Sequence, residues 1–193
     1  EVIMDGGAYA TLSGVVLSRG TLHAAGVYEC PNVRVRSKVV MTHTPPNGAF
    51  RGFGAPQTLF AVELHWERIA DALKIDSLTL RQKNIFKLGS TTSTGQTLRE
   101  SVGADECLEK TVKRSKYVSK RKEYDRWNKN PKNATWKGIG LAVCHHGAGF
   151  TGSGEVYLAS RAGVALTKAG ELVVLAASTE IGQGTNTMFA QVA

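Results

Sequence analysis

Two glycine-containing loops carry the residue types best suited to hold a flat or electron-rich ligand. One reads AFRGFGAPQ over residues 49–57, and the other reads TEIGQGTNT over residues 179–187. Each precedes a segment of helical composition, so its backbone N–H groups would lie at a helix N-terminus, where unpaired amides and the dipole favour electron-rich groups. Glycine allows close approach to the backbone, and the amides of Gln57 and Gln183 can donate and accept. On spacing alone, ordinary capping turns are the simpler interpretation of both loops.

The residue spacing excludes three other motifs: a dinucleotide-binding loop, a nucleophile elbow and a metal site at the histidine pair. A dinucleotide-binding loop that begins at Gly52 would need a third glycine at position 57, where Gln57 stands. Thr151 occupies the place of the first glycine of a nucleophile elbow. His145 and His146 are adjacent, so on a strand they would face opposite sides and could not share a metal. We expect a structural role for these two histidines.

The helices that must position the two loops follow from hydrophobic periodicity. Residues 56–73 are the clearest helix, because a proline suits the first turn and apolar residues recur at spacings of three and four. A second helix is predicted at about 77–87 with Ser77 as its N-cap, and a third at about 104–128. The residues after Gly184 predict a terminal helix.

The other patterned segments have strand composition. Residues 1–45 are predicted to be β-rich, with strand composition at 14–18 and 33–44, and further strands are predicted after residue 138. The elements are grouped by type, which favours α+β layers over a doubly wound sheet. A polar loop near residue 100 predicts two subdomains, 1–100 and 101–193.

The composition is that of a folded globular protein. Of 193 residues, 42% are hydrophobic and 21% are charged, which is enough to build a core. No apolar run approaches the roughly 18 residues that a membrane-spanning helix needs, so we expect no membrane partner. The three cysteines, Cys30, Cys107 and Cys144, are odd in number and widely spaced, which favours a reducing, cytoplasmic location over a disulfide framework.

The net charge of +8 is concentrated in one segment. Residues 110–137 contain eleven Lys or Arg and two acidic residues, a local charge of +9, so the rest of the chain carries −1. A solvated helix and connector is the preferred interpretation, because no recognised nucleic-acid-binding module surrounds the segment. We therefore do not expect nucleic acid as a partner.

Both ends of the sequence are atypical of a complete protein. The first residues, EVIMDGGAYA, contain neither an initiator Met nor the layout of a signal peptide. The last residues, GTNTMFAQVA, stop within a predicted helix. We expect the chain to be a piece of a larger protein.

Four segments together resemble the large molybdopterin-binding subunit of the molybdenum hydroxylases, the family of xanthine dehydrogenases and aldehyde oxidases. They occur in the family's order, and FRGFG followed by GQG at this distance is a specific signal. The resemblance implies two-layer α+β subdomains of the xanthine dehydrogenase molybdopterin-binding type. The segments are DGGAYA (5–10), YECPNVRVRSKVVMTHTPPNGAFRGFGAPQ (28–57), IDSLTLRQKNIFKLG (75–89) and TEIGQGTNTMFAQVA (179–193).

The resemblance implies which residues contact the cofactor. Arg51 would lie against the oxo ligands of molybdenum through its backbone amide. The turn formed by Gly182, Gln183 and Gly184 would hold the pyranopterin, with Gln183 as a hydrogen-bonding group. No side chain of this chain would bind the metal directly.

The resemblance also implies which residues contact the substrate. Phe53 and Phe150 would form the two faces of a clamp on a planar molecule, with Thr151 beside the second face. We expect Phe50, in contrast, to be a packing residue. Arg19 would orient purine-like substrates and stabilise negative charge on them, which makes it the implied catalytic residue. Its presence favours an N-heterocycle over an aldehyde.

The implied activity belongs to the larger parent, a molybdenum-dependent oxidoreductase that hydroxylates a carbon of a purine-like N-heterocycle or an aldehyde with oxygen from water. Molybdenum-molybdopterin is the implied cofactor, with the cytosine dinucleotide form as one option. Iron–sulfur centres and FAD would lie on other domains or subunits of an oligomeric parent.

The family's glutamate base matches no residue of this chain, so we expect the fragment alone to be inactive and without cofactor. A nucleic-acid-binding module that uses residues 110–137, and a non-catalytic relative that keeps the scaffold, stay open as alternatives.

Overall fold

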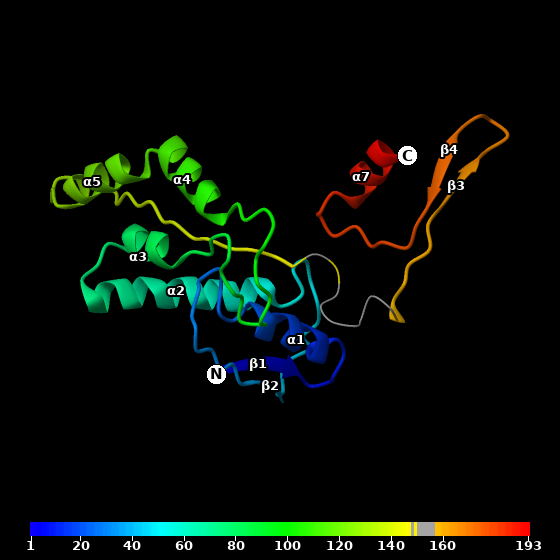
Figure 1. The fold of residues 1–193 in the computed structure, drawn as a ribbon, viewed down its shortest axis with the longest axis horizontal. Coiled ribbons are helices and arrows are strands. Elements are labelled where there is room, and N and C mark those ends of the chain that lie inside the picture. The colour runs from blue at the N-terminus through cyan, green and yellow to red at the C-terminus, as the bar shows by residue number, and fades with distance from the viewer. Residues whose placement is uncertain (148, 150–156) are drawn as a thin grey trace.

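The computed structural model describes residues 1–147, 149 and 157–193, and Figure 1 shows how their elements are arranged. After an initial β1–α1–β2 unit the helices and strands are grouped, and the mixture of both confirms the α+β class predicted from the sequence. No helix in these residues is long and apolar enough to cross a membrane. In chain order the elements are β1 (Val2–Gly7), α1 (Ser13–His23), β2 (Ser37–Met41), α2 (Ala55–Leu73), α3 (Ser77–Asn84), α4 (Ala104–Ser115), α5 (Tyr117–Asn128), β3 (Gly163–Leu166), β4 (Leu172–Leu175) and α7 (Thr185–Val192).

A parallel pair of strands lies at the N-terminal end of the fold. β1 pairs with β2 in a register that runs from Val2 opposite Ser37 to Gly7 opposite Met41. Parallel strands need a crossover connection, and α1 lies within it. Of residues 33–44, which were predicted to have strand structure, Ser37–Met41 form β2, whereas residues 33–36 precede the pairing and belong to no strand.

Helix α1 corrects the interpretation of residues 14–18 as a strand. The β-branched pair Val15 and Val16 raises the strand propensity of this segment, which hides its helical period. The buried residues recur at spacings of three and four and so form one helical face. They are Ser13, Val16, Gly20 and His23.

Helix α2 confirms the predicted helix within one residue, and α3 confirms the next one with changed ends. Gly54, in the left-handed region at φ 108°, precedes α2, and Pro56 occupies its first turn. The N-cap of α3 is Asp76 rather than Ser77, because the Asp76 carboxylate accepts from the amide of Thr79 at 3.0 Å. Helix α3 ends at Asn84, three residues before the predicted end.

The predicted helix at 104–128 is two helices, α4 and α5, which meet at Lys116 in the left-handed region. Leu108 and Tyr117 from these helices pack into one buried cluster with residues of the first half of the chain. This core therefore crosses residue 100, and the division into subdomains there stays a prediction. The other buried members are Val27, Tyr28, Leu78, Ile85 and Phe86.

The C-terminal part differs most from the prediction. Residues 138–147 form no strand, although strand composition predicted one. β3 and β4 form an antiparallel hairpin in which Gly163 faces Leu175 and Leu166 faces Leu172. In Figure 1 this hairpin (orange) and α7 (red) lie apart from α1–α5.

Candidate functional site

The two glycine-containing loops lie side by side in the folded chain. The guanidinium of Arg51, in the loop before α2, donates a hydrogen bond to the carbonyl oxygen of Gly182, in the loop before α7. A Cβ added at Gly182 would lie 2.9 Å from Arg51 Nη1, so only glycine admits this approach without a shift of the arginine. The contact brings together two helix N-termini that are separated by 131 residues in sequence.

The loop before α2 leaves several backbone amides without a partner. Phe53 donates its N–H to the Phe50 carbonyl at 2.9 Å, which closes a tight turn. Among the described residues, the amides of Arg51, Gly52 and Gly54 find no acceptor. These three N–H groups at the start of a 19-residue helix could hold an electron-rich group.

The two phenylalanines of this loop differ in environment. Phe53 is half-buried and lies in the left-handed region at φ 55°, which is uncommon for a bulky residue. Phe50, which we interpreted as a packing residue, is instead 70% exposed. It begins the turn, and its carbonyl rather than its ring is engaged there.

The second loop is held by its own side chains. Gln183 donates from Nε2 to the Thr179 carbonyl and to the Thr185 hydroxyl, both at 2.7 Å, and its Oε1 accepts from the Ile181 amide at 2.7 Å. The amide of Gln183, implied to contact a pterin, is therefore engaged within its own turn.

Glu180 has a role at the start of α7 that was not predicted from the sequence. Its Oε1 accepts from the amides of Gly182 at 2.8 Å and Gly184 at 3.1 Å, and its Oε2 accepts from Asn186 at 3.2 Å. The carboxylate thus occupies the amides at the start of α7. The sequence signal was an acidic residue shortly before a helix that lacks a capping Ser, Thr, Asp or Asn at Gly184.

Glu180 should make the turn at residues 179–186 sensitive to acid. Hydrogen bonds from the amides of Gly184, Asn186 and Gly182 hold the pKa of this exposed carboxyl below its ordinary value of 4.5. A lowered pKa in the folded state means that the stabilisation is present above pH 4.5 and is lost as the pH falls through the folded-state pKa. Amide hydrogen exchange at Gly184 should accelerate at low pH beyond the intrinsic rate, and Glu180→Gln should abolish this extra acceleration. An identical pH profile in both proteins would contradict this role.

Arg19 lies on α1 and contacts the main chain at Gly147 and Gly149. Its guanidinium donates to the Gly147 carbonyl at 3.0 Å and also to the Gly149 carbonyl. Phe150 and Thr151, the other implied substrate contacts, lie outside the described residues.

His23, one turn after Arg19, supports the same segment. Its Nε2 accepts from the Gly147 amide at 3.3 Å, so the ring proton must lie on Nδ1, which is 2.8 Å from the Arg19 carbonyl. This arrangement fixes a neutral tautomer. His23 is 3% exposed, and no motif in the sequence indicates its role.

His145 and His146 both pack against His23, which corrects the expectation that they face opposite sides. Their ring centroids lie 5.0 Å and 5.5 Å from that of His23, because this segment is irregular rather than a strand. Loss of solvation and then the nearby His23 lower the pKa of His145. Loss of solvation and then the Arg19 guanidinium lower the pKa of His146.

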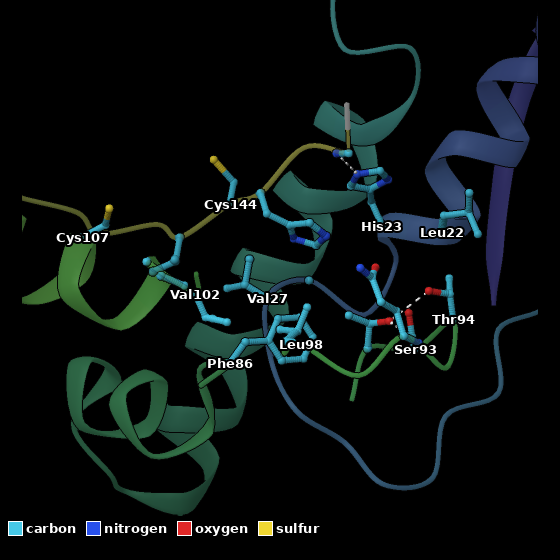
Figure 2. A pocket seen from close by; sticks show the side chains of 18 of the residues that line it. Leu22, His23, Val27, Phe86, Ser93, Thr94, Leu98, Val102, Cys107 and Cys144 are labelled. Carbon is cyan, nitrogen blue, oxygen red and sulfur yellow. Dashed lines mark hydrogen bonds between the residues drawn. The ribbon is translucent and has the colours of Figure 1, made fainter. Parts of the chain in front are cut away.

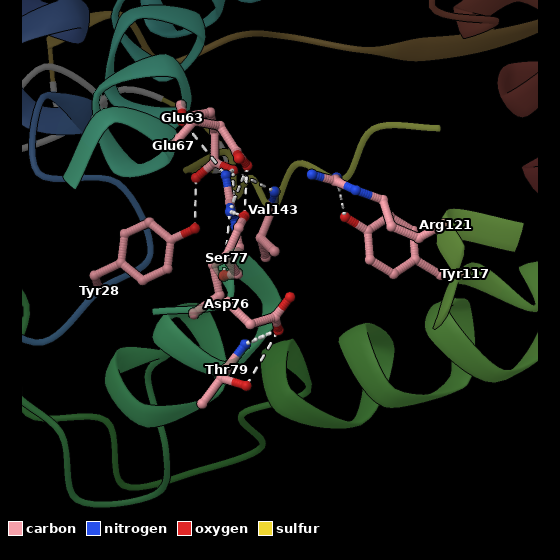
Figure 3. A network of polar contacts seen from close by, with 10 residues as sticks. Tyr28, Glu63, Glu67, Asp76, Ser77, Thr79, Tyr117, Arg121 and Val143 are labelled. Carbon is pink, nitrogen blue, oxygen red and sulfur yellow. Dashed lines mark hydrogen bonds and ion pairs between the residues drawn. The ribbon is translucent and has the colours of Figure 1, made fainter. Parts of the chain in front are cut away.

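A buried polar network contacts the segment that leads to Gly147 (Figure 3). Arg81, fully buried on α3, donates from Nε and Nη2 to Glu63 Oε2, both at 3.0 Å. Glu63 Oε1 accepts from the Tyr28 hydroxyl at 2.5 Å, and Oε2 also accepts from the Val143 amide at 3.0 Å. Burial, together with the Glu63 carboxylate, raises the pKa of Tyr28 far above its ordinary value. One carboxylate thus joins α2, α3 and the segment that leads to Gly147.

Comparison with known proteins finds two matches to the same kind of domain. Residues 1–85 and residues 110–193 match two family models, each described as a molybdopterin cofactor-binding domain. Within the described residues, no group of three or more His, Cys, Asp or Glu could hold a metal ion.

Individual relatives agree with these matches. The chain is 44% identical over 110 residues to the nicotinate dehydrogenase large molybdopterin subunit of Eubacterium barkeri, covering 57% of this chain and 26% of that protein. It is 30% identical over 197 residues to xanthine dehydrogenase/oxidase of Rattus norvegicus, covering 98% and 14%. The aldehyde oxidoreductase of Desulfovibrio gigas superposes with a TM-score of 0.70 at 29% identity, covering 89% and 18%. The chain thus spans about a quarter or less of the length of each.

Proposed function

This chain belongs to the molybdenum hydroxylase family, and from this premise we propose that it forms part of the catalytic unit of an enzyme that hydroxylates a carbon of an N-heterocycle or an aldehyde. The observation that carries the proposal is the contact between Arg51 and Gly182, which joins the two loops expected to hold the cofactor. The named relatives act on nicotinate, xanthine and aldehydes, so the family supports both substrate classes.

The residues of the first loop fit a molybdopterin cofactor. The amides of Arg51, Gly52 and Gly54 have no acceptor among the described residues, and they stand at the N-terminus of α2. Electron-rich oxygens of a ligand would supply the acceptors that these donors lack. When bound, the cofactor supplies the redox chemistry, and the protein supplies binding and orientation.

The second loop offers a preformed turn rather than free donors. Glu180 engages the amides of Gly182, Gly184 and Asn186, and Gln183 is tied to Thr179 and Thr185. We propose that these contacts fix the turn so that its outer surface lies against the pterin. Gln183 would contact the pterin directly only by exchanging one of its present hydrogen bonds.

Phe53 and Arg19 are the proposed substrate-facing residues. The left-handed backbone at Phe53 fixes the direction of its ring, and an aromatic face binds a planar heterocycle at little entropic cost. Arg19 carries a positive charge next to Gly147 and Gly149. This charge would stabilise negative charge that develops on the substrate. Phe150 and Thr151 remain proposed as the opposite side of the clamp.

The remaining proposals concern the parent protein. We propose that residues 1–100 and 101–193 belong to two molybdopterin-binding subdomains. Iron–sulfur centres and FAD on other domains or subunits would carry electrons away, and the cofactor would be plain molybdopterin or its cytosine dinucleotide form.

The decisive experiment uses the natural protein that contains this sequence, purified from a host that makes the cofactor. Elemental analysis should find about one molybdenum per chain in the wild type and in an Arg19→Met variant. Loss of a charge-stabilising donor typically lowers turnover by about 10²–10³-fold. Turnover of a purine-like heterocycle by the variant should fall by about this factor, whereas turnover of an aldehyde should fall much less.

Two outcomes would overturn parts of this assignment. A folded wild-type protein without molybdenum would remove the hydroxylase function. Equal losses on heterocycle and aldehyde, with molybdenum retained, would remove Arg19 from substrate orientation and leave it as an anchor of Gly147 and Gly149.

A further inference from the structure

The structure contains a cavity of about 470 Å³, which Figure 2 shows from close by. It is bounded by the end of α1, by the polar loop before α4 and by the segment that leads to Gly147. None of its lining residues belongs to the loops at 47–57 or 179–187. Its size falls within the range of small-molecule sites, roughly 300–1,000 Å³.

The described residues that line this cavity carry no formal charge. Charged residues make up 21% of the chain, yet none of the 19 lining residues is Asp, Glu, Lys or Arg. An ion inside would lose hydration without gaining a counter-charge, so an uncharged ligand is favoured.

The two sides of the cavity have different chemistry. One side is apolar and includes Val27, Phe86 and Leu98, of which Val27 and Phe86 belong to the buried core. The loop before α4 contributes hydroxyl and amide groups from Thr92, Ser93, Thr94 and Gln96 to the lining. A ligand that matches both sides has a flat apolar body and hydrogen-bonding groups along one edge.

Two imidazoles complete the lining. His23 is held as a neutral ring by its two hydrogen bonds, and its ring stacks at 5.0 Å on that of His145. His145 also meets Phe86 edge to face at 6.3 Å. Loss of solvation lowers the pKa of His145, so it is neutral at pH 7 and can both donate and accept.

We propose that this cavity is a second small-molecule site, which binds an uncharged, planar aromatic compound of about two fused rings with hydrogen-bonding groups on one edge. The rings lie against the apolar side formed by Val27, Phe86 and Leu98. The polar edge faces the hydroxyls of residues 92–94 and the ring of His145. The site is independent of the cofactor-binding loops.

Three isosteric probes test the charge requirement: 2-naphthamide, the 2-naphthoate anion and the 2-naphthamidine cation. Calorimetry of the 193-residue chain at pH 7.5 should give a dissociation constant for the amide at least tenfold lower than for either ion. The proposal is overturned if an ion binds as tightly as the amide, or if none of the three binds.

The cysteines report where the probe binds. Cys107 and Cys144 line the cavity and are exposed, whereas Cys30 is exposed elsewhere on the chain. Saturating 2-naphthamide should slow iodoacetamide labelling of Cys107 and Cys144 at least threefold and leave Cys30 unchanged, as read by peptide mass spectrometry. Equal protection of all three, or protection of none, would contradict this location.

A blocking variant provides the matched control. Ser101→Trp places a large ring at an exposed position of the lining and should weaken 2-naphthamide binding at least tenfold. Ser119→Trp makes the same change on exposed α5, outside the cavity, and should leave binding unaltered. Undiminished binding to a folded Ser101→Trp chain would overturn the site.

Discussion

Replacing Arg81 with methionine should lower the free energy of unfolding of this chain by about 3–5 kcal/mol, the usual effect of removing one partner of a buried ion pair. Arg81 is fully buried, and its loss would leave the Glu63 carboxylate, itself 8% exposed, without its counter-charge. Although burial works against the charged guanidinium, Glu63 raises the pKa of Arg81, so the guanidinium stays charged in the folded state. Urea unfolding at pH 7, followed by circular dichroism, measures the change.

Two further variants separate charge from packing. Lys38→Met removes an exposed ion pair with Glu1 and should change stability by no more than about 1 kcal/mol. Adding Glu63→Gln to Arg81→Met removes the stranded charge but keeps an oxygen for the Tyr28 hydroxyl. The double variant should therefore be more stable than Arg81→Met alone. A loss below 1 kcal/mol in Arg81→Met, or a double variant that is less stable still, would show that the ion pair does not carry this part of the fold.

The buried pair of Glu63 and Arg81 could not be predicted from the sequence. Helix α2 was predicted within one residue because its apolar period and its proline are local signals. Glu63 and Arg81 are 18 residues apart, and each taken alone is typical of an exposed helix face. Only the packing of α3 on α2 places one against the other, so the pair becomes visible with the tertiary structure.

The candidate site, too, could be predicted from the sequence only in part. Both glycine-containing loops were recognised as helix-initiating turns, since glycine and proline punctuate the chain locally. The hydrogen bond that joins Arg51 to Gly182 spans 131 residues, and no periodicity encodes it. Phe50 was misplaced because an aromatic residue is usually buried, whereas here the turn closes through its carbonyl.

Gly54→Ala should be the most damaging single-methyl change in the loop before α2. Gly54 lies at φ 108°, where a side chain costs about 1–3 kcal/mol of backbone strain. A Cβ there would also lie 2.1 Å from the carbonyl oxygen of Val16, so α1 would have to move away from α2. Forced displacement of this kind costs a further amount of about 1–3 kcal/mol. Urea unfolding should therefore show a total loss of about 2–6 kcal/mol.

Gly184→Ala is the matched control, because Gly184 also precedes a helix and also lies in the left-handed region, at φ 86°. A Cβ at Gly184 would meet no described atom within 4 Å, so this variant carries the backbone strain without the collision. Its loss should stay within about 1–3 kcal/mol, and the mostly exposed helix α7 can shift to relieve it. Equal losses in the two variants would mean that the Val16 contact adds nothing and that backbone conformation alone requires Gly54. A larger loss in Gly54→Ala would instead establish that α1 sets the position of the loop whose amides are proposed to hold the cofactor.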